Sequence, residues 1–288
     1  MENHLEIKNK KIIITGASHG FGFQLAKYFS HKGAEILITG RNLVSLQNAQ
    51  KIIQKSSKSK VFIKTCDISV KKQNEYVFHY AIDVLKRVDV LIANAGVYGP
   101  KGEVEKLSWE DWSKAIDINL KGTVLSCISV LNHMKNNNYG KIIIMSGGGA
   151  TKPMPKVSAY AASKAGVVRF METLAKETES FNIGVNAIAP GAMNTRLLDE
   201  IVDAGPKLVG KEFFKKAVEQ KESGGTKMIH AIKLCEYLVS SYGDGITGKL
   251  ISAIWDPWKK FDLYKEKLSN SDIYTLRRII PEERNENW

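Results

Sequence analysis

Residues 11–40 read KIIITGASHGFGFQLAKYFSHKGAEILITG, and the fold can be worked out from this stretch. Residues 11–15 predict a strand, 20–32 a helix, and 35–39 a second strand. The strands are rich in Ile and do not alternate with polar residues, which is typical of strands buried on both faces. A strand, a helix and another strand in this order predict two parallel strands joined by a crossover helix.

The same alternation continues along the chain. Further strands are predicted over 60–65, 88–93, 141–146, 183–188 and 246–254, and helices over 42–56, 71–86, 108–136 and 157–180. Regular alternation of this kind predicts an α/β fold with a doubly wound parallel sheet of about seven strands and helices on both faces. We expect a single domain over residues 1–288. Two segments look like additions to it: a helical insert over 193–226 on the substrate side, and a C-terminal extension over 256–288.

The composition is that of a globular protein, with 288 residues of which 43% are hydrophobic and 25% charged. The longest apolar runs, 12–14 and 142–145, fall far short of the ~18–20 residues that a membrane helix needs. Residues 1–11 are polar and lack the apolar core of a signal peptide. Cys66, Cys127 and Cys235 are odd in number and widely spaced, which argues against a disulfide framework. A cytoplasmic protein with no membrane partner is predicted.

The chain is basic, with 42 Lys and Arg against 30 Asp and Glu and hence a net charge of +12. Such a charge attracts anions, nucleic acids included. The lysines are spread out, however, and no basic tail exists. We therefore interpret the charge as a solvated basic surface and predict no nucleic-acid partner. The six histidines show no metal-binding spacing, so no metal is predicted.

Two interpretations of the glycine-rich strings are set aside. Residues 243–249, GDGITGK, nearly match a phosphate-binding P-loop, but Leu250 follows where a hydroxyl would hold Mg²⁺, and a strand follows instead of a helix. Residues 16–20, GASHG, match the G-x-S-x-G turn that carries a nucleophilic serine in hydrolases. That turn belongs on a central strand with Asp and His partners after it, whereas this one follows the first strand.

The remaining interpretation of this turn is a dinucleotide site, Thr15-Gly16-x-x-x-Gly20-x-Gly22, between a strand and a helix. Gly16 permits a tight turn, Gly20 lets the backbone approach a pyrophosphate, and Gly22 allows the helix to pack closely on the strand. The helix N-terminus adds free amides and a positive dipole.

Further motifs follow in order along the chain. They are Asn94-Ala95-Gly96 at the end of the fourth strand, Asn119 in a helix, Ser146 at the end of the fifth strand, Tyr160-Ala-Ala-Ser-Lys164 on a helix, and Pro190-Gly191 with Thr195 after the sixth strand. Over about residues 10–254 the chain thus resembles the classical short-chain dehydrogenase/reductase family. The resemblance implies a Rossmann-type fold and an NAD(P)-dependent oxidoreductase that interconverts a carbonyl and an alcohol.

The catalytic residues that the resemblance implies also make chemical sense together. A tyrosine that acts as general acid and base needs a pKa lowered from ~10 toward neutrality. Lys164 lies four residues after Tyr160 on the same helix face, where its charge favours the phenolate. By resemblance, Lys164 also binds the nicotinamide ribose hydroxyls, Ser146 polarises the substrate carbonyl, and Asn119 holds a proton-relay water.

The serine spacing departs from the family. Family members place the serine thirteen residues before the tyrosine, where this chain has Gly147, and Ser146 lies fourteen residues before Tyr160. A loop one residue longer, within 150–157, would absorb the shift, and we expect this because loops tolerate insertions. We therefore predict that the Ser146 hydroxyl points toward the Tyr160 hydroxyl. The alternative is a displaced hydroxyl in an impaired site, which would favour a dinucleotide-binding redox sensor or scaffold protein.

The end of the second strand predicts the choice of cofactor. An acidic residue there would bind the adenosine ribose of NAD, but this chain has Gly40, followed by Arg41. An arginine can bind a 2′-phosphate through charge-assisted hydrogen bonds, and His19 adds a basic group, so NADP(H) is predicted over NAD(H). By resemblance, Asp67 meets the adenine amine. The predicted cofactor set is Gly16, Ser18, His19, Gly20, Gly22, Arg41, Asp67, Asn94, Gly96, Tyr160, Lys164, Pro190, Gly191 and Thr195.

The substrate stays open, because the positive charge would suit an anionic compound and a small neutral ketone is equally permitted. We expect a homo-oligomer, a dimer or a tetramer. The extension over 256–288 contains Trp258, Phe261, Tyr264, Tyr274 and Trp288, and its charges cancel, which is unlike a disordered tail. We expect it to be ordered and packed across the substrate cleft or onto a neighbouring subunit.

Overall fold

The computed structural model describes residues 7–286, so residues 1–6 and 287–288, with Trp288, lie outside the description. Its centre is a sheet of seven parallel strands in the order β3-β2-β1-β4-β5-β6-β7. The strands are β1 (Lys11–Ile14), β2 (Glu35–Gly40), β3 (Val61–Thr65), β4 (Val90–Ala93), β5 (Gly140–Met145), β6 (Ile183–Ala189) and β7 (Leu250–Ser252). The predicted doubly wound sheet is confirmed. Strand β7 is much shorter than the predicted 246–254.

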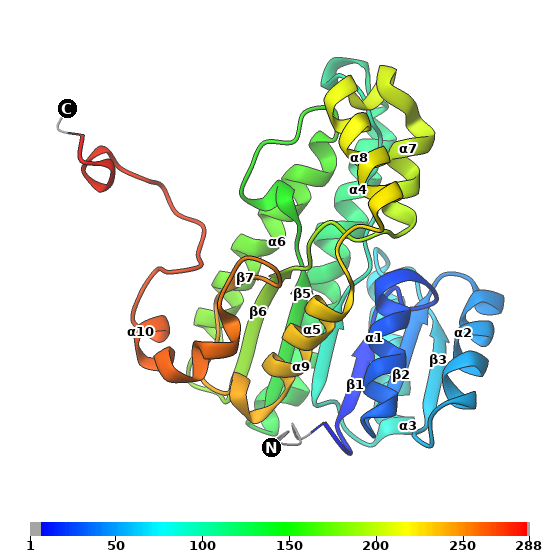
Figure 1. Cartoon of the computed structure of the whole chain (residues 1–288). Coiled ribbons are helices and arrows are strands. Elements are labelled where there is room, and N and C mark those ends of the chain that lie inside the picture. Colours follow the sequence, from blue (N-terminus) through cyan, green and yellow to red (C-terminus); the bar gives the residue numbers. More distant parts are fainter. Residues whose placement is uncertain (1–6, 287–288) are drawn as a thin grey trace.

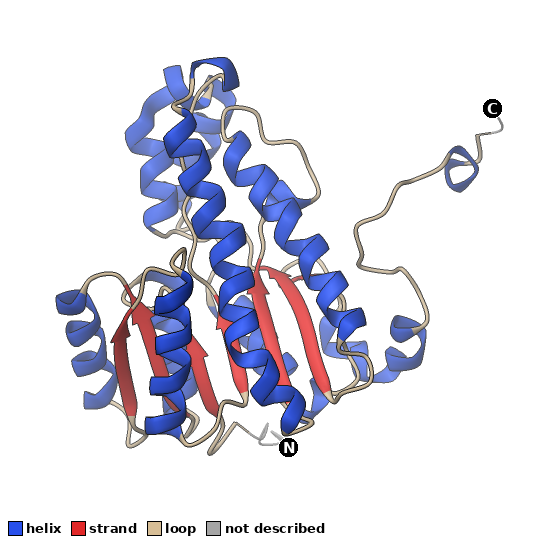
Figure 2. Ribbon diagram, turned by 180° about the vertical axis from the view of Figure 1, so that it is seen from behind, coloured by secondary structure: helices blue, strands red, loops and turns tan. Residues whose placement is uncertain are grey.

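Helices cover both faces of the sheet (Figures 1 and 2). One face carries α1 (Gly20–His31), α2 (Leu43–Lys55) and α9 (Ile229–Val239), and the other carries α3 (Lys71–Leu85), α5 (Gly122–Asn136) and α6 (Ser158–Glu177). Sequence analysis did not predict α9, because nearly all of IHAIKLCEYLV is buried and no polar face marks a helical period. Within residues 7–286, no helix is both long and apolar enough to cross a membrane.

Strand β1 shows why its sequence does not alternate. Ile12 and Ile14 are buried in the core that includes α1 and α9, whereas Ile13 is buried in the core that includes α5 and α6. Both faces of the strand therefore need apolar residues, each worth roughly 1.5–3 kcal/mol when fully buried. In the parallel register Ile13 lies beside Leu37 of β2 and Leu91 of β4, so the carboxyl ends of these three strands meet at one edge of the sheet.

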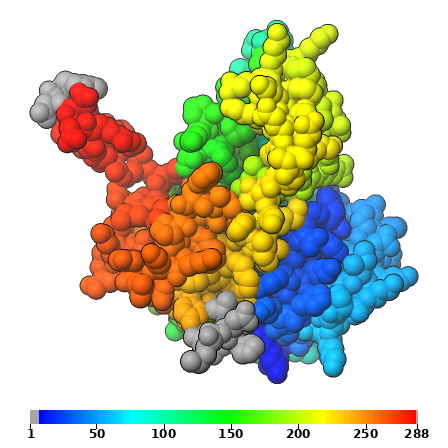
Figure 3. Space-filling view, viewed as in Figure 1, coloured from blue at the N-terminus to red at the C-terminus, as the bar shows by residue number. Residues whose placement is uncertain are grey.

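A helical lobe rises beyond the carboxyl ends of the strands (Figures 1 and 3). It contains α7 (Arg196–Val209) and α8 (Lys211–Ser223), the helices within the segment 193–226. Gly205, with φ of 74°, bends α7 before Pro206, and Gly210, with φ of 87°, separates α7 from α8. The predicted helix over 108–136 is a continuous helical stretch of α4 (Trp109–Ile116), a π-helical turn (Asp117–Lys121) and α5.

The C-terminal extension folds against its own chain as far as Leu276. It forms short helical segments over Trp258–Tyr264, Lys265–Ser269 (α10) and Pro281–Arg284. The side chains of Trp258, Phe261 and Leu268 are buried in the core that includes α1 and α9. The Trp258 ring packs edge-on against Tyr237 of α9. The extension therefore contributes side chains to the hydrophobic core of the domain.

Main-chain contacts then fix the extension along the edge of the sheet. The Leu250 N–H of β7 donates to the Tyr274 carbonyl (2.8 Å), and the Leu276 N–H donates to Glu172 Oε1 on α6 (2.6 Å). The last stretch of the chain, drawn in red in Figure 1, leaves the body of the protein. The extension therefore covers the β7 edge, and the prediction that it crosses the cleft at the carboxyl ends of the strands is wrong. Packing on a second subunit stays a prediction for residues beyond Leu276.

Candidate active site

The glycine turn after β1 is held rigidly against β4. Gly16, with φ of 64°, packs so closely on the loop that follows β4 that an added Cβ would lie 2.7 Å from Ala95 Cα. The Asn94 amide donates to the carbonyls of Thr15 (2.9 Å) and Gly16 (3.1 Å), and Thr15 Oγ1 accepts from the Asn94 and Ala95 N–H groups. The side chain of Asn94, predicted as a cofactor contact, thus supports the turn from behind.

The far side of the turn is open. Gly20, with φ of 59°, has no neighbouring atom within 4 Å of an added Cβ, and α1 begins there. At Gly22 an added Cβ would lie 2.5 Å from Asn94 Nδ2, so this glycine is required for close packing of α1. The turn therefore offers the first amides of α1 to a ligand, and no acidic residue in the first turn opposes a phosphate.

Basic groups gather where β2 ends. An added Cβ at Gly40 would lie 3.4 Å from Ser18 Oγ, and Ser18 in turn is hydrogen-bonded to His19 Nδ1 (2.9 Å). Burial, and then the charges of Arg196 and Arg41, lower the pKa of His19. The exposed Arg41 also borders a hollow of about 280 Å³. Sequence analysis missed Arg196, because it lies on the distant α7.

Asp67 lies close to the same charges. Partial burial acts to raise the pKa of Asp67, but hydrogen bonds from Ser69 and the charges of Arg41 and Lys114 outweigh it and lower the pKa. Its Oδ1 accepts from both the N–H (3.0 Å) and the hydroxyl (2.6 Å) of Ser69. The carboxylate is therefore ionised and oriented at neutral pH. Lys114 of α4 was not predicted, since nothing in the sequence links α4 to Asp67.

Tyr160 and Lys164 lie one turn apart on α6 and are both buried. Lys164 Nζ donates to the Met145 carbonyl at the end of β5 (2.8 Å) and lies 5.6 Å from the centre of the Tyr160 ring. Burial lowers the pKa of Lys164 to about 8. Burial, and then the neighbouring Tyr98, raise the pKa of Tyr160 above its usual range. The pKa of Tyr160 is thus shifted opposite to the lowering expected from the sequence, and the phenol is protonated at neutral pH.

Asn119 lies on the π-helical turn between α4 and α5, and both ends of its side-chain amide are hydrogen-bonded. Oδ1 accepts from the Val97 N–H (2.8 Å), and Nδ2 donates to the Val97 carbonyl (2.8 Å) and to Ser163 Oγ (2.9 Å). An added Cβ at Gly96 would lie 3.2 Å from Asn119 Oδ1 and 3.6 Å from Lys164 Nζ. Asn119 therefore joins the loop after β4 to α6 and holds both beside Lys164.

Ser146 is not where the sequence analysis predicted it. Its hydroxyl is buried and has no hydrogen-bond partner among the described residues, so it is not bonded to the Tyr160 hydroxyl. Gly147 faces Tyr160 instead, and the hydroxyl of Tyr160 fills the space that a side chain at this position would need. The reason is that Gly147 continues the extended backbone of β5, where successive side chains point to opposite sides. The longer loop does not bring Ser146 round.

The remaining predicted residues follow β6. Gly191, with φ of 94°, packs against the end of the sheet, where an added Cβ would lie 3.0 Å from Ile254 Cγ1. Pro190 precedes it, and Thr195 is the residue before α7, with its carbonyl accepting from the Leu198 N–H (2.8 Å). The chain thus turns from β6 into α7 beside the other site residues.

The helical lobe closes over Tyr160. Leu198, Ile201 and Val209 of α7 form one buried cluster with Tyr160 and Val157, and only 8% of Tyr160 is exposed. The ring of Tyr98 lies beside it, 4.5 Å away between ring centres. None of these neighbours of Tyr160 was predicted as a site residue. A signal existed for Tyr98 alone, because it directly follows the Asn94–Gly96 motif.

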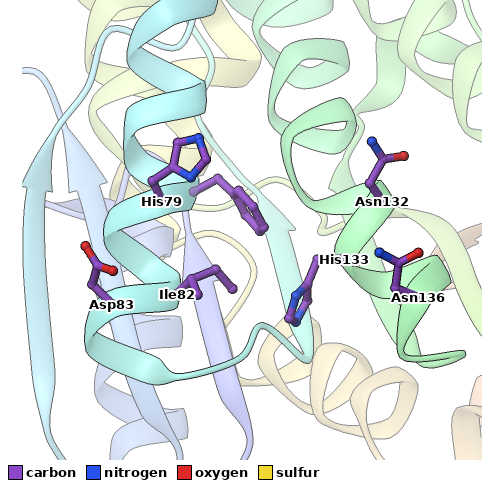
Figure 4. A pocket seen from close by; sticks show the side chains of 7 residues that line it. His79, Ile82, Asp83, Asn132, His133 and Asn136 are labelled. Carbon is purple, nitrogen blue, oxygen red and sulfur yellow. The ribbon is translucent and has the colours of Figure 1, made fainter.

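A second hollow, of about 390 Å³, lies far from this site (Figure 4). It is lined by His79 of α3 and His133 of α5 near the amino ends of the strands, where the Val88 N–H donates to His133 Nε2 (3.2 Å). Within residues 7–286, no group of three or more His, Cys, Asp or Glu side chains is placed to hold a metal ion. The three cysteines are buried and free.

The sequence matches the family model for short chain dehydrogenase over residues 10–205. An uncharacterised oxidoreductase of Listeria innocua is 35% identical over 201 residues, which cover 69% of this chain and 80% of the relative. The 3-oxoacyl-[acyl-carrier-protein] reductase of Chlamydia muridarum is 31% identical over 244 residues, covering 85% of this chain and 95% of the relative.

Solved structures show the same fold. Levodione reductase superposes with a TM-score of 0.78 at 23% identity, covering 85% of this chain and 96% of that structure. NAD⁺-bound xylitol dehydrogenase superposes with a TM-score of 0.79 at 22% identity, covering 86% and 98%. With two thirds of its length inside the family model, the chain belongs to the short-chain dehydrogenase/reductase family, whose members are NAD(P)-dependent oxidoreductases acting on CH–OH groups.

Proposed function

We propose that this protein is an NADP(H)-dependent enzyme that interconverts a carbonyl and an alcohol, with Tyr160 as the general acid and base. The observation that carries the proposal is the buried pair of Tyr160 and Lys164, one turn apart on α6. The pair stands at the same edge of the sheet as the open glycine turn. Perturbed titratable groups in such a place are typical of an active site.

The turn and its surroundings fit a dinucleotide. Gly20 leaves its side of the turn free of side-chain atoms, and the first amides of α1 suit a pyrophosphate. Lys164 would bind the ribose hydroxyls, and the turn at Pro190 and Gly191, with Thr195, would border the nicotinamide. When bound, the nicotinamide supplies or takes up the hydride.

The chain's own residues handle the proton. Reduction adds a hydride to the carbonyl carbon, and the Tyr160 hydroxyl gives its proton to the oxygen. Tyr160 is left as a phenolate beside Lys164, and a proton from water restores it. In the oxidation direction the same phenolate accepts the proton of the alcohol. Asn119 acts at a distance, because its side chain holds the loop after β4 against α6.

The experiment that tests this function is Tyr160→Phe. The variant lacks only the transferable proton, so we expect turnover to fall at least ~10²–10⁴-fold, as is typical for a lost general acid, with NADPH affinity unchanged. The assay follows NADPH absorbance with carbonyl compounds that include 3-oxoacyl thioesters and nucleotide sugars. Tyr139→Phe is the matched control, because Tyr139 is bonded to Lys10 just before β5, far from the site. Substantial activity in Tyr160→Phe would mean that the acid is another group.

The cofactor choice rests on Arg41. No carboxylate follows β2, and Arg41, with His19 and Arg196 near it, makes this end of the turn positive. A charge-assisted hydrogen bond to the 2′-phosphate is worth about 1.5–3 kcal/mol, so Arg41→Ala should weaken NADPH binding by about 10–100-fold. NADH, which lacks this phosphate, is the internal control and should bind both proteins alike. Calorimetric titration measures both, and tighter binding of NADH than of NADPH by the wild type would contradict the choice.

We extend the proposal to the substrate, the assembly and the location of the protein. The buried wall of Leu198 and Ile201 suits an apolar group next to the reacting carbon, and the net charge of +12 suits an anionic part farther away. The reductase from Chlamydia muridarum acts on acyl chains linked to a carrier protein, which combines both properties. We further propose a homo-oligomer, a dimer or a tetramer, in the cytoplasm.

A second candidate function is a dinucleotide-binding redox sensor or scaffold protein. The observation that favours it is Gly147, which leaves the Tyr160 hydroxyl without a serine beside it. Such a protein would bind NADPH and turn over no carbonyl compound. Calorimetry and the NADPH assay on the same preparation separate the two functions.

A further inference from the structure

The Tyr160 hydroxyl has an unusual neighbourhood for an acid that acts on a carbonyl. It fills the space that a side chain at Gly147 would need, and the Ser146 hydroxyl is buried without a hydrogen-bond partner among the described residues. A carbonyl that receives a hydride develops negative charge on its oxygen, and a second hydrogen-bond donor aimed at that oxygen stabilises the transition state. Gly147 has no side chain for this purpose, and the Ser146 hydroxyl is not hydrogen-bonded to Tyr160.

Tyr98 lies beside Tyr160. The two ring centres are 4.5 Å apart and the ring planes are inclined by 45°. Neither phenol has a hydrogen-bond partner among the described residues. Tyr98 follows the loop in which Val97 is bonded to Asn119 and Gly96 approaches Lys164. Its ring is thus fixed to the same framework as Lys164.

The surroundings keep Tyr98 protonated. Burial, and then the charge of Glu200 on α7, raise the pKa of Tyr98 to about 12. Glu200 is paired with Lys101 (3.4 Å), and Lys101 also donates to the Gly99 carbonyl (3.1 Å). Such a phenol is neutral at neutral pH, so its hydroxyl can donate a hydrogen bond. Lys101, the amine near its ring (5.9 Å), is paired with Glu200 and so does little to stabilise a phenolate.

We propose that Tyr98 is the second hydrogen-bond donor to the substrate carbonyl, in the role that Ser146 cannot fill. This inference rests on the proposed carbonyl reduction. Tyr160 transfers its proton to the oxygen, whereas Tyr98 keeps its proton and only shares it. Tyr98 is then a catalytic residue in the sense that its hydroxyl touches the reacting oxygen. The lobe that carries Glu200 would close over both tyrosines.

The test is Tyr98→Phe in the full-length protein. Phenylalanine keeps the ring and its packing on Tyr160, so a merely structural role would leave the variant unchanged. We expect kcat to fall about 10²–10³-fold, as for other lost oxyanion donors. NADPH affinity and melting temperature should stay as in the wild type. Tyr139→Phe, remote from the site, is the matched control and should keep full activity.

A binding measurement makes the result independent of turnover. Cyclohexanone is titrated into the NADP⁺-loaded protein, in which no hydride is available to reduce it, and binding is followed by the tryptophan fluorescence of the protein. Loss of one neutral hydrogen bond should weaken its binding about three- to tenfold in Tyr98→Phe. If Tyr160→Phe is inactive while Tyr98→Phe keeps its kcat, the inference about Tyr98 is overturned and the proposed function stands. If neither the wild type nor any variant turns over a carbonyl compound, the proposed function is wrong. In that case, equal cyclohexanone affinity of the wild type and Tyr98→Phe overturns the inference about Tyr98 as well.

Discussion

Lys164 shows how a single side chain can cost stability and serve function. It is buried, and its one hydrogen bond goes to an uncharged group, the Met145 carbonyl. A charged amine without a paired carboxylate is expensive to bury, because the surroundings replace little of its hydration. The lowered pKa of Lys164 expresses this cost. Residues that are unfavourable for the fold are expected at sites where their charge is used.

Lys164→Met should therefore stabilise the fold while abolishing turnover. The pKa of Lys164 falls from 10.5 to about 8 on folding, which corresponds to roughly 3 kcal/mol of lost stability. Below pH 8 the lysine is protonated in both states and the cost is fully present. Between pH 8 and 10.5 only the unfolded chain holds the proton, so the stability of the wild type rises with pH.

Urea unfolding at pH 7 and pH 10.5 checks this prediction. The variant should exceed the wild type by about 1–3 kcal/mol at pH 7, because the lost bond to Met145 offsets part of the gain. The difference should shrink at pH 10.5. A gap that does not change with pH would mean that the lysine is solvated in the folded protein.

A side chain at position 147 is expected to clash with Tyr160. A methyl group at this position would collide with the Tyr160 hydroxyl, whereas at Gly148 an added Cβ meets nothing within 4 Å. Gly147→Ala should lower kcat by about 10²-fold, because a displacement of one ångström at a reacting group costs that much. Gly148→Ala is the matched control and should be active. Steady-state kinetics of the two variants decides, and equal activity would place the acting hydroxyl elsewhere.

At the scale of elements, the extension is the clearest addition to the family fold. Trp258, Phe261 and Leu268 enter the core, and the segment up to Leu276 runs along β7. An uncovered edge strand exposes unpaired N–H and C=O groups that invite association with other chains. The extension covers that edge within the same molecule.

Two truncations should therefore behave differently. Removal of 277–288 leaves every core contact in place, so the melting temperature should not change. Removal of 255–288 strips three buried side chains, each worth roughly 1.5–3 kcal/mol, and should lower the melting temperature sharply or cause aggregation. Phe261→Ala, expected to cost about 3–5 kcal/mol, tests the same contact if the longer truncation is insoluble. Equal melting temperatures of Phe261→Ala and the wild type would show that the extension is dispensable.

At the scale of the whole molecule, the topology explains why the site forms at one place. Strand β1 lies between β2 and β4. Strands β2 and β3 are added on one side of β1 and β4 to β7 on the other, so the strand order reverses between β1 and β4. Ligands of open parallel sheets bind at such a topological switch point, beyond the carboxyl ends of the strands. The glycine turn after β1 and the loop after β4 flank it, and the lobe of α7 and α8 closes it from above (Figure 3).

The sequence by itself determined the sheet, the glycine turn and the pair of Tyr160 and Lys164. Each of these depends on short spacings: apolar runs for buried strands, glycines where the backbone must turn, and a four-residue step along one helix. The interactions that determine these features act between residues close together in the chain. The features can therefore be inferred without knowing the rest of the fold.

The tertiary structure alone decided which side chain faces Tyr160. Ser146 and Gly147 differ by one position, and only the direction in which β5 enters the sheet determines which of them points into the site. The same holds for Tyr98, for the lobe over Tyr160 and for the extension along β7. Each depends on packing between segments far apart in the sequence, and the free energy of such contacts is shared among many residues, so no single spacing reveals it.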